Sequence, residues 1–218
     1  MKGQDPVTER VRVKRLPERG MYDRETIDAI LDEARICHLG FVADGQPFVI
    51  PTIHARAGDR VYVHGSTASR MLRTVREGFP VCLTVTILDG VVVARSVFES
   101  SMNYRSVLVL GSARPVEDRD EKLAGLRAIV EHVLPGRWSE ARLPNDAELK
   151  QTLLLAIPLD EASAKVRTGP PKDKEEDFEL PIWAGVVPAA LAWFSPKPDP
   201  SLRPGTEVPS SVSRLASG

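Results

Sequence analysis

Hydrophobic residues change their spacing along the chain, and each change marks a predicted element. Apolar residues at helical spacing follow Asp23, which predicts a helix from residue 23 to about residue 35 with Asp23 as its N-cap. From residue 37 onward, hydrophobic and polar positions alternate instead. Between Pro80 and Ile87, for instance, the odd-numbered residues are aliphatic and most even-numbered ones are small or polar. This alternation is typical of strands that bury one face.

Pairs of glycine and aspartate separate the predicted strands. We expect turns at Asp44-Gly45, Gly58-Asp59 and Asp89-Gly90, because these residue types tolerate the positive φ angles of tight turns. Consecutive hairpins without crossover helices indicate antiparallel pairing, so we predict a mainly β fold, a barrel with peripheral α-helices. The strands are predicted over residues 37–43, 47–55, 60–64, 80–87, 91–97, 104–116 and 152–159.

Three parts of the chain are expected to differ in order. Residues 1–21 carry mixed charge and form an N-terminal arm, residues 22–194 form the folded domain, and residues 195–218 form a flexible or surface-hugging tail. Inside the domain, a second helix begins at the N-cap Asp118 and stops before Pro135-Gly136. Its predicted buried stripe is Leu123, Leu126, Val130 and Val133.

Composition narrows the class of protein. The 218 residues are 42% hydrophobic, and 29 basic against 30 acidic side chains give a net charge of −1, which argues against a nucleic-acid coat. The two cysteines, Cys37 and Cys82, lack a CxxC or zinc-ligand spacing, so both are expected to be reduced thiols. There is no apolar run of membrane-spanning length and no secretory signal. We therefore predict a cytoplasmic protein that binds neither nucleic acid nor membrane.

One stretch, residues 62–76, has features of a phosphate site. A predicted strand ends at His64, Gly65 permits close backbone approach, and Ser66 or Thr67 caps a following helix. Four arginines and no carboxylate lie between residues 60 and 76, and Arg70 falls in the first turn, where a cation opposes the helix dipole. An anionic ligand accounts for this placement. The alternative is an ordinary capped helix with solvated arginines.

Two further polar segments and the histidines are candidates with open alternatives. Residues 100–106 offer donors to a ligand or simply cap a barrel end, and in residues 163–171 Lys165 and Arg167 share a face if the segment is a strand. The alternative there is surface charge balancing the acidic residues that follow. His54 and His64 end neighbouring strands but have no metal-ligand companions, so we predict no metal. His38 is expected to be structural and His132 to lie on the polar side of its helix.

Taken together, five segments resemble a known family. They are Leu39-Gly-Phe, Gly45-Gln-Pro-Phe-Val-Ile-Pro51, Tyr62-Val-His-Gly-Ser, Asn103-Tyr-Arg-Ser-Val and Lys165-Val-Arg. In order and spacing they resemble the pyridoxamine 5′-phosphate oxidase-like superfamily of FMN-binding split barrels, in particular the branch with nitroimidazole-resistance reductases. The resemblance covers residues 23–194. It implies a six-stranded antiparallel split barrel that forms a homodimer with two FMN molecules at the subunit interface.

The resemblance also implies a set of cofactor contacts. One strand lies along the flavin ring and ribityl chain, the next ends at the phosphate, and later segments reach the same flavin, some of them from the partner chain. Trp183 resembles the aromatic residue that borders the cofactor. The implied cofactor-binding residues are Pro51, Thr52, Ile53, His54, His64, Gly65, Ser66, Ser69, Arg70, Asn103, Tyr104, Arg105, Ser106, Lys165, Arg167 and Trp183.

The function implied is an FMN-dependent oxidoreductase acting on a small conjugated acceptor such as a nitroaromatic or a quinone, with NADH or NADPH as reductant. His64 or Tyr104 is the expected catalytic proton donor. Residues 193–200 lack the basic, histidine-containing segment of true oxidases, so vitamin B6 oxidation is not expected. The alternative function is a non-catalytic carrier of flavin, haem or deazaflavin, with His54 or His64 as the axial ligand of a haem. The third hypothesis is a structural dimer with a vestigial site.

Overall fold

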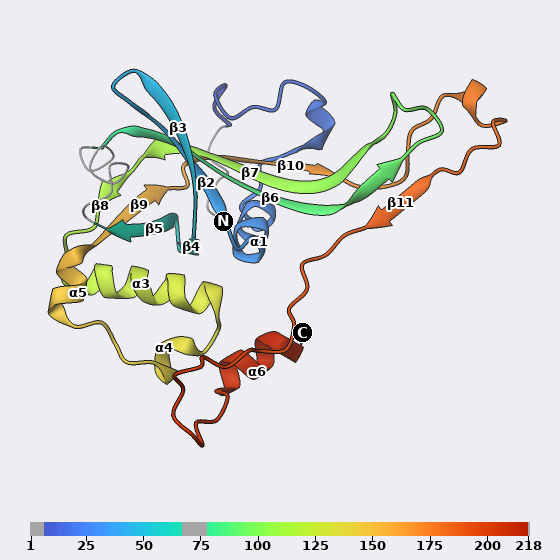
Figure 1. Ribbon diagram of the computed structural model, residues 1–218. Coiled ribbons are helices and arrows are strands. Elements are labelled where there is room, and N and C mark those ends of the chain that lie inside the picture. Colours follow the sequence, from blue (N-terminus) through green and yellow to red (C-terminus); the bar gives the residue numbers. More distant parts are fainter. Residues whose placement is uncertain (1–6, 67–77, 218) are drawn as a thin grey trace.

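The strands lie in two antiparallel sheets (Figure 1). The computed structural model describes residues 7–66 and 78–217. Within these residues, the larger sheet has seven strands in the order β1 (Gly20–Met21), β10 (Glu161–Arg167), β7 (Ser101–Ser112), β6 (Pro80–Val93), β2 (Cys37–Ala43) and β3 (Gln46–Thr52), with β11 (Gly185–Pro188) also beside β6. The smaller sheet contains β4 (His54–Ala57), β5 (Arg60–Ser66), β9 (Thr152–Pro158) and β8 (Arg114–Pro115). The prediction of a mainly β, antiparallel fold is confirmed.

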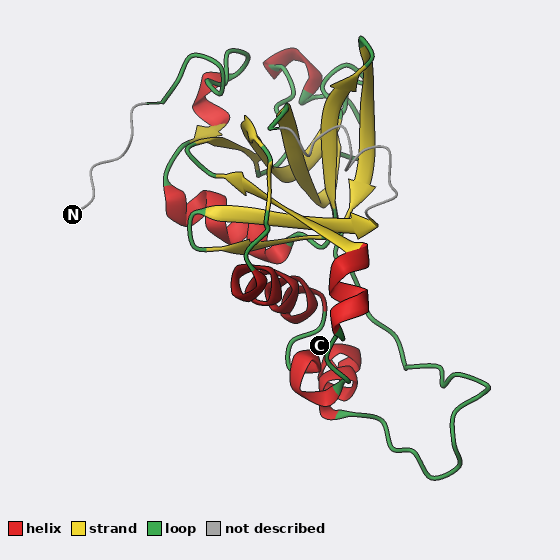
Figure 2. Cartoon of the chain, turned by 90° about the vertical axis from the view of Figure 1, so that its left-hand side faces the viewer, coloured by secondary structure: helices red, strands yellow, loops and turns green. Residues whose placement is uncertain are grey.

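Helices flank the sheets. The elements are η1 (Pro17–Arg19), α1 (Arg24–Glu33), α3 (Arg119–Val133), α4 (Arg137–Glu140), α5 (Asp146–Gln151), η2 (Glu175–Asp177) and α6 (Ser210–Ser217). The predicted caps of α1 and α3 are confirmed, since the Asp23 carboxylate accepts from the Thr26 N–H at 2.8 Å and Asp118 caps α3 in the same way. Figures 1 and 2 place α3 and the short helices after it on one side of the sheets. None of the described helices is long and apolar enough to cross a membrane.

The main core lies between the sheets and α1. Ile27 and Leu31 of α1 pack with Leu39, Leu83 and other aliphatic residues of both sheets, and all four side chains are buried. Full burial of an aliphatic side chain of this size contributes roughly 1.5–3 kcal/mol, so this cluster dominates the stability of the fold. A second cluster lies between α3 and the smaller sheet around Ile129.

The predicted turn at Asp44-Gly45 is confirmed, but the one at Asp89-Gly90 is wrong. Asp44 and Gly45 have φ angles of 51° and 75°, as a tight β2–β3 turn requires. At Asp89-Gly90, β6 continues without turning, and its register with β7 shifts between Leu88 and Gly90, which marks a bulge. A Cβ on Gly90 would lie 2.7 Å from the Val187 carbonyl oxygen, so glycine is needed here for the close approach of β11. Residues 88–102 and 183–188 together form a β extension that projects from the body (Figure 1).

The second helix and the tail also differ from the prediction, because of how they pack. The fully buried residues of α3 are Gly125 and Ile129, while the four residues of the predicted stripe are half-buried or exposed. Gly125 is buried because β9 and Tyr62 approach closely, and a Cβ there would lie 2.5 Å from Leu154 Cδ2. The tail, expected to be flexible or to hug the surface, ends in α6. Its buried Ser211 donates to the carboxylate of Glu140, the last residue of α4.

Candidate functional site

Polar side chains gather on the face of the larger sheet that points away from α1. Leu39, Leu83 and Val109 point into the core, and the alternation of strand residues places their neighbours on the opposite, outer face. Strand register joins these outer residues into two rows. One row contains Pro51, His38, Thr84, Leu108 and Ser163, and the next contains Thr86, Ser106 and Lys165. At roughly 4.8 Å per strand, the first row spans about 19 Å, which is enough for an elongated ligand.

A cavity of about 740 Å³ lies at one end of this face. Pro51 and His38 contribute from β3 and β2, Thr86 and Arg105 from β6 and β7, and Trp193 from the segment after β11. His38, expected to be structural, is exposed on this wall. The cavity therefore combines aromatic, apolar, imidazole and hydroxyl groups with charged side chains of both signs, including Glu33 and Asp89. The uncharged part of this wall is suited to a conjugated ring with polar edges.

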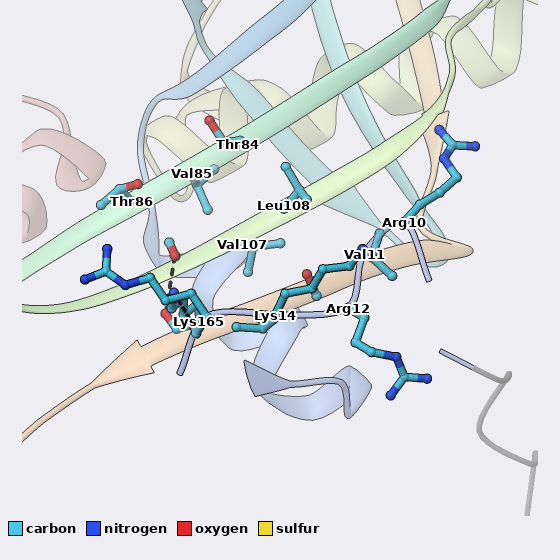
Figure 3. A pocket seen from close by; sticks show the side chains of 14 residues that line it. Arg10, Val11, Arg12, Lys14, Thr84, Val85, Thr86, Val107, Leu108 and Lys165 are labelled. Carbon is cyan, nitrogen blue, oxygen red and sulfur yellow. Dashed lines mark hydrogen bonds between the residues drawn. The ribbon is translucent and has the colours of Figure 1, made fainter. Parts of the chain in front are cut away.

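A second cavity of about 420 Å³ lies under the N-terminal strap, which we define as residues 10–15 (Figure 3). The strap crosses the outer face of β6, β7 and β10, so this part of the N-terminal arm is docked on the body. The wall contains five basic side chains and no carboxylate, together with hydroxyl groups of β6, β7 and β10. Thr86 lines both cavities, which makes them neighbours. The first cavity also reaches the α1 side of the sheet, where Asp89 and Arg105 contribute to its wall.

Arg105 reaches the first cavity with its charge already balanced. Its guanidinium donates to Asp89 at 2.7 and 3.0 Å and to Glu33. These carboxylates raise the pKa of Arg105, and Arg105 lowers the pKa of Glu33. Arg105 therefore lines the cavity as predicted for a cofactor contact, but its guanidinium already donates to two carboxylates.

Arg167, in contrast, is a buried cation without a carboxylate partner among the described residues. It is 7% exposed, and its Nη1 donates to Asn103 Oδ1 at 2.5 Å, while Asn103 Nδ2 donates to the Gly169 carbonyl at 3.1 Å. Burial, followed by the nearby Arg19, lowers the pKa of Arg167. Its register partner Tyr104 is half-buried on β7. A buried, uncompensated guanidinium is costly, so this position favours an anionic neighbour.

The prediction that Lys165 and Arg167 share a face is confirmed, because they lie two residues apart on strand β10. Lys165 Nζ donates to the Arg15 carbonyl at 3.0 Å, and Ser106 Oγ donates to the Lys165 carbonyl at 3.3 Å. Of the predicted contacts, Pro51, Arg105, Ser106 and Lys165 thus line the two neighbouring cavities.

His54 does not fit its predicted role. Its side chain is fully buried, its Nε2 lies 3.0 Å from the Leu31 carbonyl oxygen, and its ring centroid lies 5.0 Å from that of His132. Burial, and then the neighbouring His132, lower the pKa of His54 to about 4. The imidazole is therefore a neutral group enclosed by the core, and its Nδ1 has no hydrogen-bond partner among the described residues. His132, expected on the polar side of its helix, faces inward and lies 2.7 Å from the Ala34 carbonyl oxygen.

The remaining predicted residues lie elsewhere. Thr52 and Ile53 end β3 and connect it to β4, next to Pro51. His64, Gly65 and Ser66 end β5 in the smaller sheet. Ser69 and Arg70, the predicted phosphate anchors, and the helix predicted around them lie outside the described residues.

The predicted residues His64 and Trp183 lie in contrasting surroundings, one half-buried and the other exposed. His64 is half-buried, burial lowers its pKa, and its buried Nδ1 has no hydrogen-bond partner among the described residues. Trp183 is 65% exposed beside β11, on the β extension. No group of three or more metal-ligating side chains occurs in the described part of the chain.

Sequence reasoning missed His38, Thr86, Trp193 and the strap cation Lys14 as wall residues. The alternation in β2 and β6 did place His38 and Thr86 on one face, so that signal was present. Trp193 and Lys14 carry no such signal. They reach the sheet only because the N-terminal strap and the segment after β11 fold back onto it.

Comparison with known proteins gives consistent matches. Residues 23–166 match a family profile described as pyridoxamine 5′-phosphate oxidase. The flavocytochrome Anf3 from Azotobacter vinelandii is 41% identical, with 96% of this chain and 99% of that chain covered and a TM-score of 0.90. The FAD and heme binding protein from Mycobacterium smegmatis is 39% identical, with 91% and 97% covered and a TM-score of 0.87.

A more distant structure, a 5-nitroimidazole antibiotic resistance protein from Bacteroides thetaiotaomicron, is 23% identical over 67% of this chain and 86% of that chain. Its TM-score of 0.54 shows the shared fold alone. A search of curated proteins finds no match.

Proposed function

The chain belongs to the pyridoxamine 5′-phosphate oxidase family, and from that premise we propose that it is an oxidoreductase that binds a flavin and a haem. The observation that carries this proposal is the pair of neighbouring cavities that meet at Thr86. The two similar proteins, described as a flavocytochrome and as an FAD and heme binding protein, match over nine-tenths or more of this chain.

The first cavity fits a flavin ring. Pro51 and Trp193 offer flat or aromatic surface, and Thr86 and His38 offer groups that hydrogen-bond to the polar edge of a ring system. The cationic wall under the strap fits the phosphate end of the same molecule. Bound there, the flavin supplies the redox chemistry, and the residues of this chain bind and orient it.

A haem requires a neutral imidazole that it can reach. His54 is enclosed by the core, His132 Nε2 lies 2.7 Å from the Ala34 carbonyl oxygen, and His38 lies in the cavity assigned to the flavin. His64 remains: burial lowers its pKa and so favours the neutral imidazole, and its Nδ1 has no partner within the described residues. A haem iron would therefore be held by His64.

Exposed apolar side chains on the β extension support the homodimer that the family resemblance implies. Val97 is 93% exposed, Phe98 87% and Trp183 65%, and surface of this kind marks interaction sites. A second copy that covers the β extension would bury these residues. In such a dimer Trp183 would border the flavin of the partner, which is the role predicted for it.

The reaction we propose takes electrons from NADH or NADPH and delivers them to a small conjugated acceptor, such as a quinone or a nitroaromatic. Tyr104, half-buried and in register with Arg167, is next to the cavity residues Arg105 and Ser106 in sequence, and we propose it as the proton donor. The guanidinium of Arg167 stabilises negative charge that develops next to it.

The purified full chain tests this proposal. We expect flavin and Soret absorption together, bleaching of the flavin bands by NADH or NADPH without oxygen, and their return when a quinone is added. His64→Ala should lose the Soret band and keep the flavin, whereas His38→Ala should keep the Soret band. A protein that carries flavin and haem but is reduced by neither nucleotide would be a carrier, and a protein that binds neither group would refute the proposal.

A further inference from the structure

The N-terminal strap presents most of its charge to solvent. Val11 and Val13 face the sheet, and Lys165 of β10 is half-buried against the strap, where its Nζ donates to the Arg15 carbonyl. The other strap side chains are exposed cations, namely Arg10, Arg12, Lys14 and Arg15. In the part of the chain that the structure describes, Lys14 and Arg15 have no carboxylate partner. The outer surface of the strap is therefore a basic stripe.

The β extension ends in a tip made of two chain segments. We define the tip as residues 95–99 and 172–180, which lie at the end of the extension far from the body (Figure 1). Asp173, whose side chain is 1% exposed, joins the segments, since it accepts from the Arg95 N–H at 2.8 Å and pairs with Arg95 Nη1 at 2.9 Å. The same guanidinium lies 5.2 Å from the centroid of the Phe178 ring. These contacts hold the tip together as one unit.

The tip is acidic and apolar at its surface. Residues 172–179 contain five acidic and two basic side chains. Glu175 and Glu179 are exposed and take part in no ion pair between described residues. On the neighbouring segment, Val97 and Phe98 are 93% and 87% exposed. Exposed apolar side chains beside unpaired charges of one sign are typical of a protein-binding surface, and the charges here require a basic partner.

The strap has the complementary charge, but the tip of the same chain lies too far away to pair with it. The strap crosses β6 beside Thr86, and the tip follows the end of β6 at Val93. Seven strand residues at about 3.3 Å each separate these points by roughly 23 Å. Accordingly, no ion pair joins tip and strap within residues 7–66 and 78–217. A second copy lying antiparallel across the sheet would bring its tip to the strap, and two-fold symmetry would make the contact reciprocal.

From these observations we infer that the acidic tip of each chain docks on the basic strap of a second copy. The inference rests on the homodimer of the proposed function and names the surface that covers the β extension. Opposite charges orient the two copies, while Val97 and Phe98 supply the apolar contact. The docked tip also presses the strap against the sheet, so the N-terminal segment becomes part of the dimer interface.

Charge reversal on both surfaces tests the inference in the full chain. The strap variant carries Lys14→Glu with Arg15→Glu, and the tip variant carries Glu175→Lys with Glu179→Lys, all at exposed side chains. The combined variant carries all four substitutions, so its charges are exchanged between the two surfaces. Circular dichroism establishes that each variant is folded, and analytical ultracentrifugation gives the dissociation constant of the dimer.

A matched control separates local from overall charge. Lys150→Glu with Lys197→Glu changes the net charge as much as the strap variant does, at exposed lysines outside tip and strap. We expect the strap and tip variants each to weaken the dimer roughly 10-fold or more, because like charges then face each other, and the control to have little effect. The combined variant should regain most of the lost affinity.

Mixing the strap variant with the tip variant distinguishes contacts between chains from contacts within one chain. In their heterodimer both contacts join opposite charges, so an equimolar mixture should form heterodimers in preference to either homodimer. Higher salt should weaken the unmodified dimer, which tests the electrostatic contact without any substitution.

Dimer affinity that neither charge reversal nor salt changes would overturn the inference and leave the proposed homodimer to another face of the chain. Rescue in the combined variant without heterodimers in the mixture would place the contact within one chain and would also overturn it. An unmodified chain that stays monomeric would overturn both the inference and the proposed homodimer, and would leave the strap to a different acidic partner. Flavin and haem content, measured on the same samples, tests the proposed cofactors separately.

Discussion

Acid should weaken the fold through the buried His54. The pKa of this imidazole is about 4 in the folded chain, and it returns to about 6.5 when unfolding exposes the ring. A group with a lowered pKa stabilises the fold above its unfolded pKa, and that stability is lost as the pH falls from about 6.5 toward about 4. From these two values, the free energy of unfolding should fall by roughly 2 kcal/mol between pH 7 and pH 5.

The assay compares urea unfolding of the unmodified chain and His54→Asn at pH 8, 7, 6 and 5, followed by tryptophan fluorescence. Asparagine cannot gain a proton, so the difference in stability between the two proteins should shrink by roughly 2 kcal/mol from pH 7 to pH 5 and stay nearly constant from pH 8 to pH 7. His132, whose pKa burial also lowers, lies 5.0 Å from His54, so the double variant His54→Asn with His132→Asn is compared with His132→Asn alone to separate the two contributions. Parallel pH profiles for the two proteins would refute the burial argument for His54.

Three further predictions concern the β extension and the helix caps. Gly90→Ala places a Cβ 2.7 Å from the Val187 carbonyl oxygen, so β11 should detach from β6 and become a site of rapid hydrogen exchange; unchanged protection of β11 would contradict the bulge assignment. Asp118→Ala removes the N-cap of α3 and should lower the free energy of unfolding by about 1 kcal/mol. Asp120→Ala, two residues further along in the first turn and not a cap, should lower it by less. Equal losses in thermal unfolding would contradict the capping role of Asp118. Phe98→Asp should shift the proposed dimer to monomer in analytical ultracentrifugation, since this side chain is 87% exposed on the β extension, and an unchanged dimer would exclude that surface.

Local sequence signals predicted the elements whose structure depends on local chemistry. The Asp44-Gly45 turn and the Asp23 and Asp118 caps were all found where the residue types place them. Asp89-Gly90 carries the same turn signal, yet Gly90 serves the approach of β11, which returns from about a hundred residues later. A residue pair alone does not distinguish a turn from a bulge, because the strand that decides the matter is remote.

The candidate site likewise has features that the local sequence predicts and features that depend on remote parts of the chain. The face shared by Lys165 and Arg167 follows from strand alternation and was predictable. The burial of His54 depends on the C-terminal end of α1 and on His132 of α3 meeting around it, which no local pattern reports. The strap cavity depends on residues 10–15 crossing β10, so the sequence shows its cations without showing what they enclose.

The central claim is that one chain holds both a flavin and a haem, and the cofactor content of the purified protein tests it most directly. Flavin released by acid and haem measured as the pyridine complex are each compared with the protein concentration from amino-acid analysis. We expect a flavin and a haem in equal amounts, about one of each per chain, with the haem lost and the flavin retained in His64→Ala. A protein that takes up neither group when both are supplied during expression would contradict it.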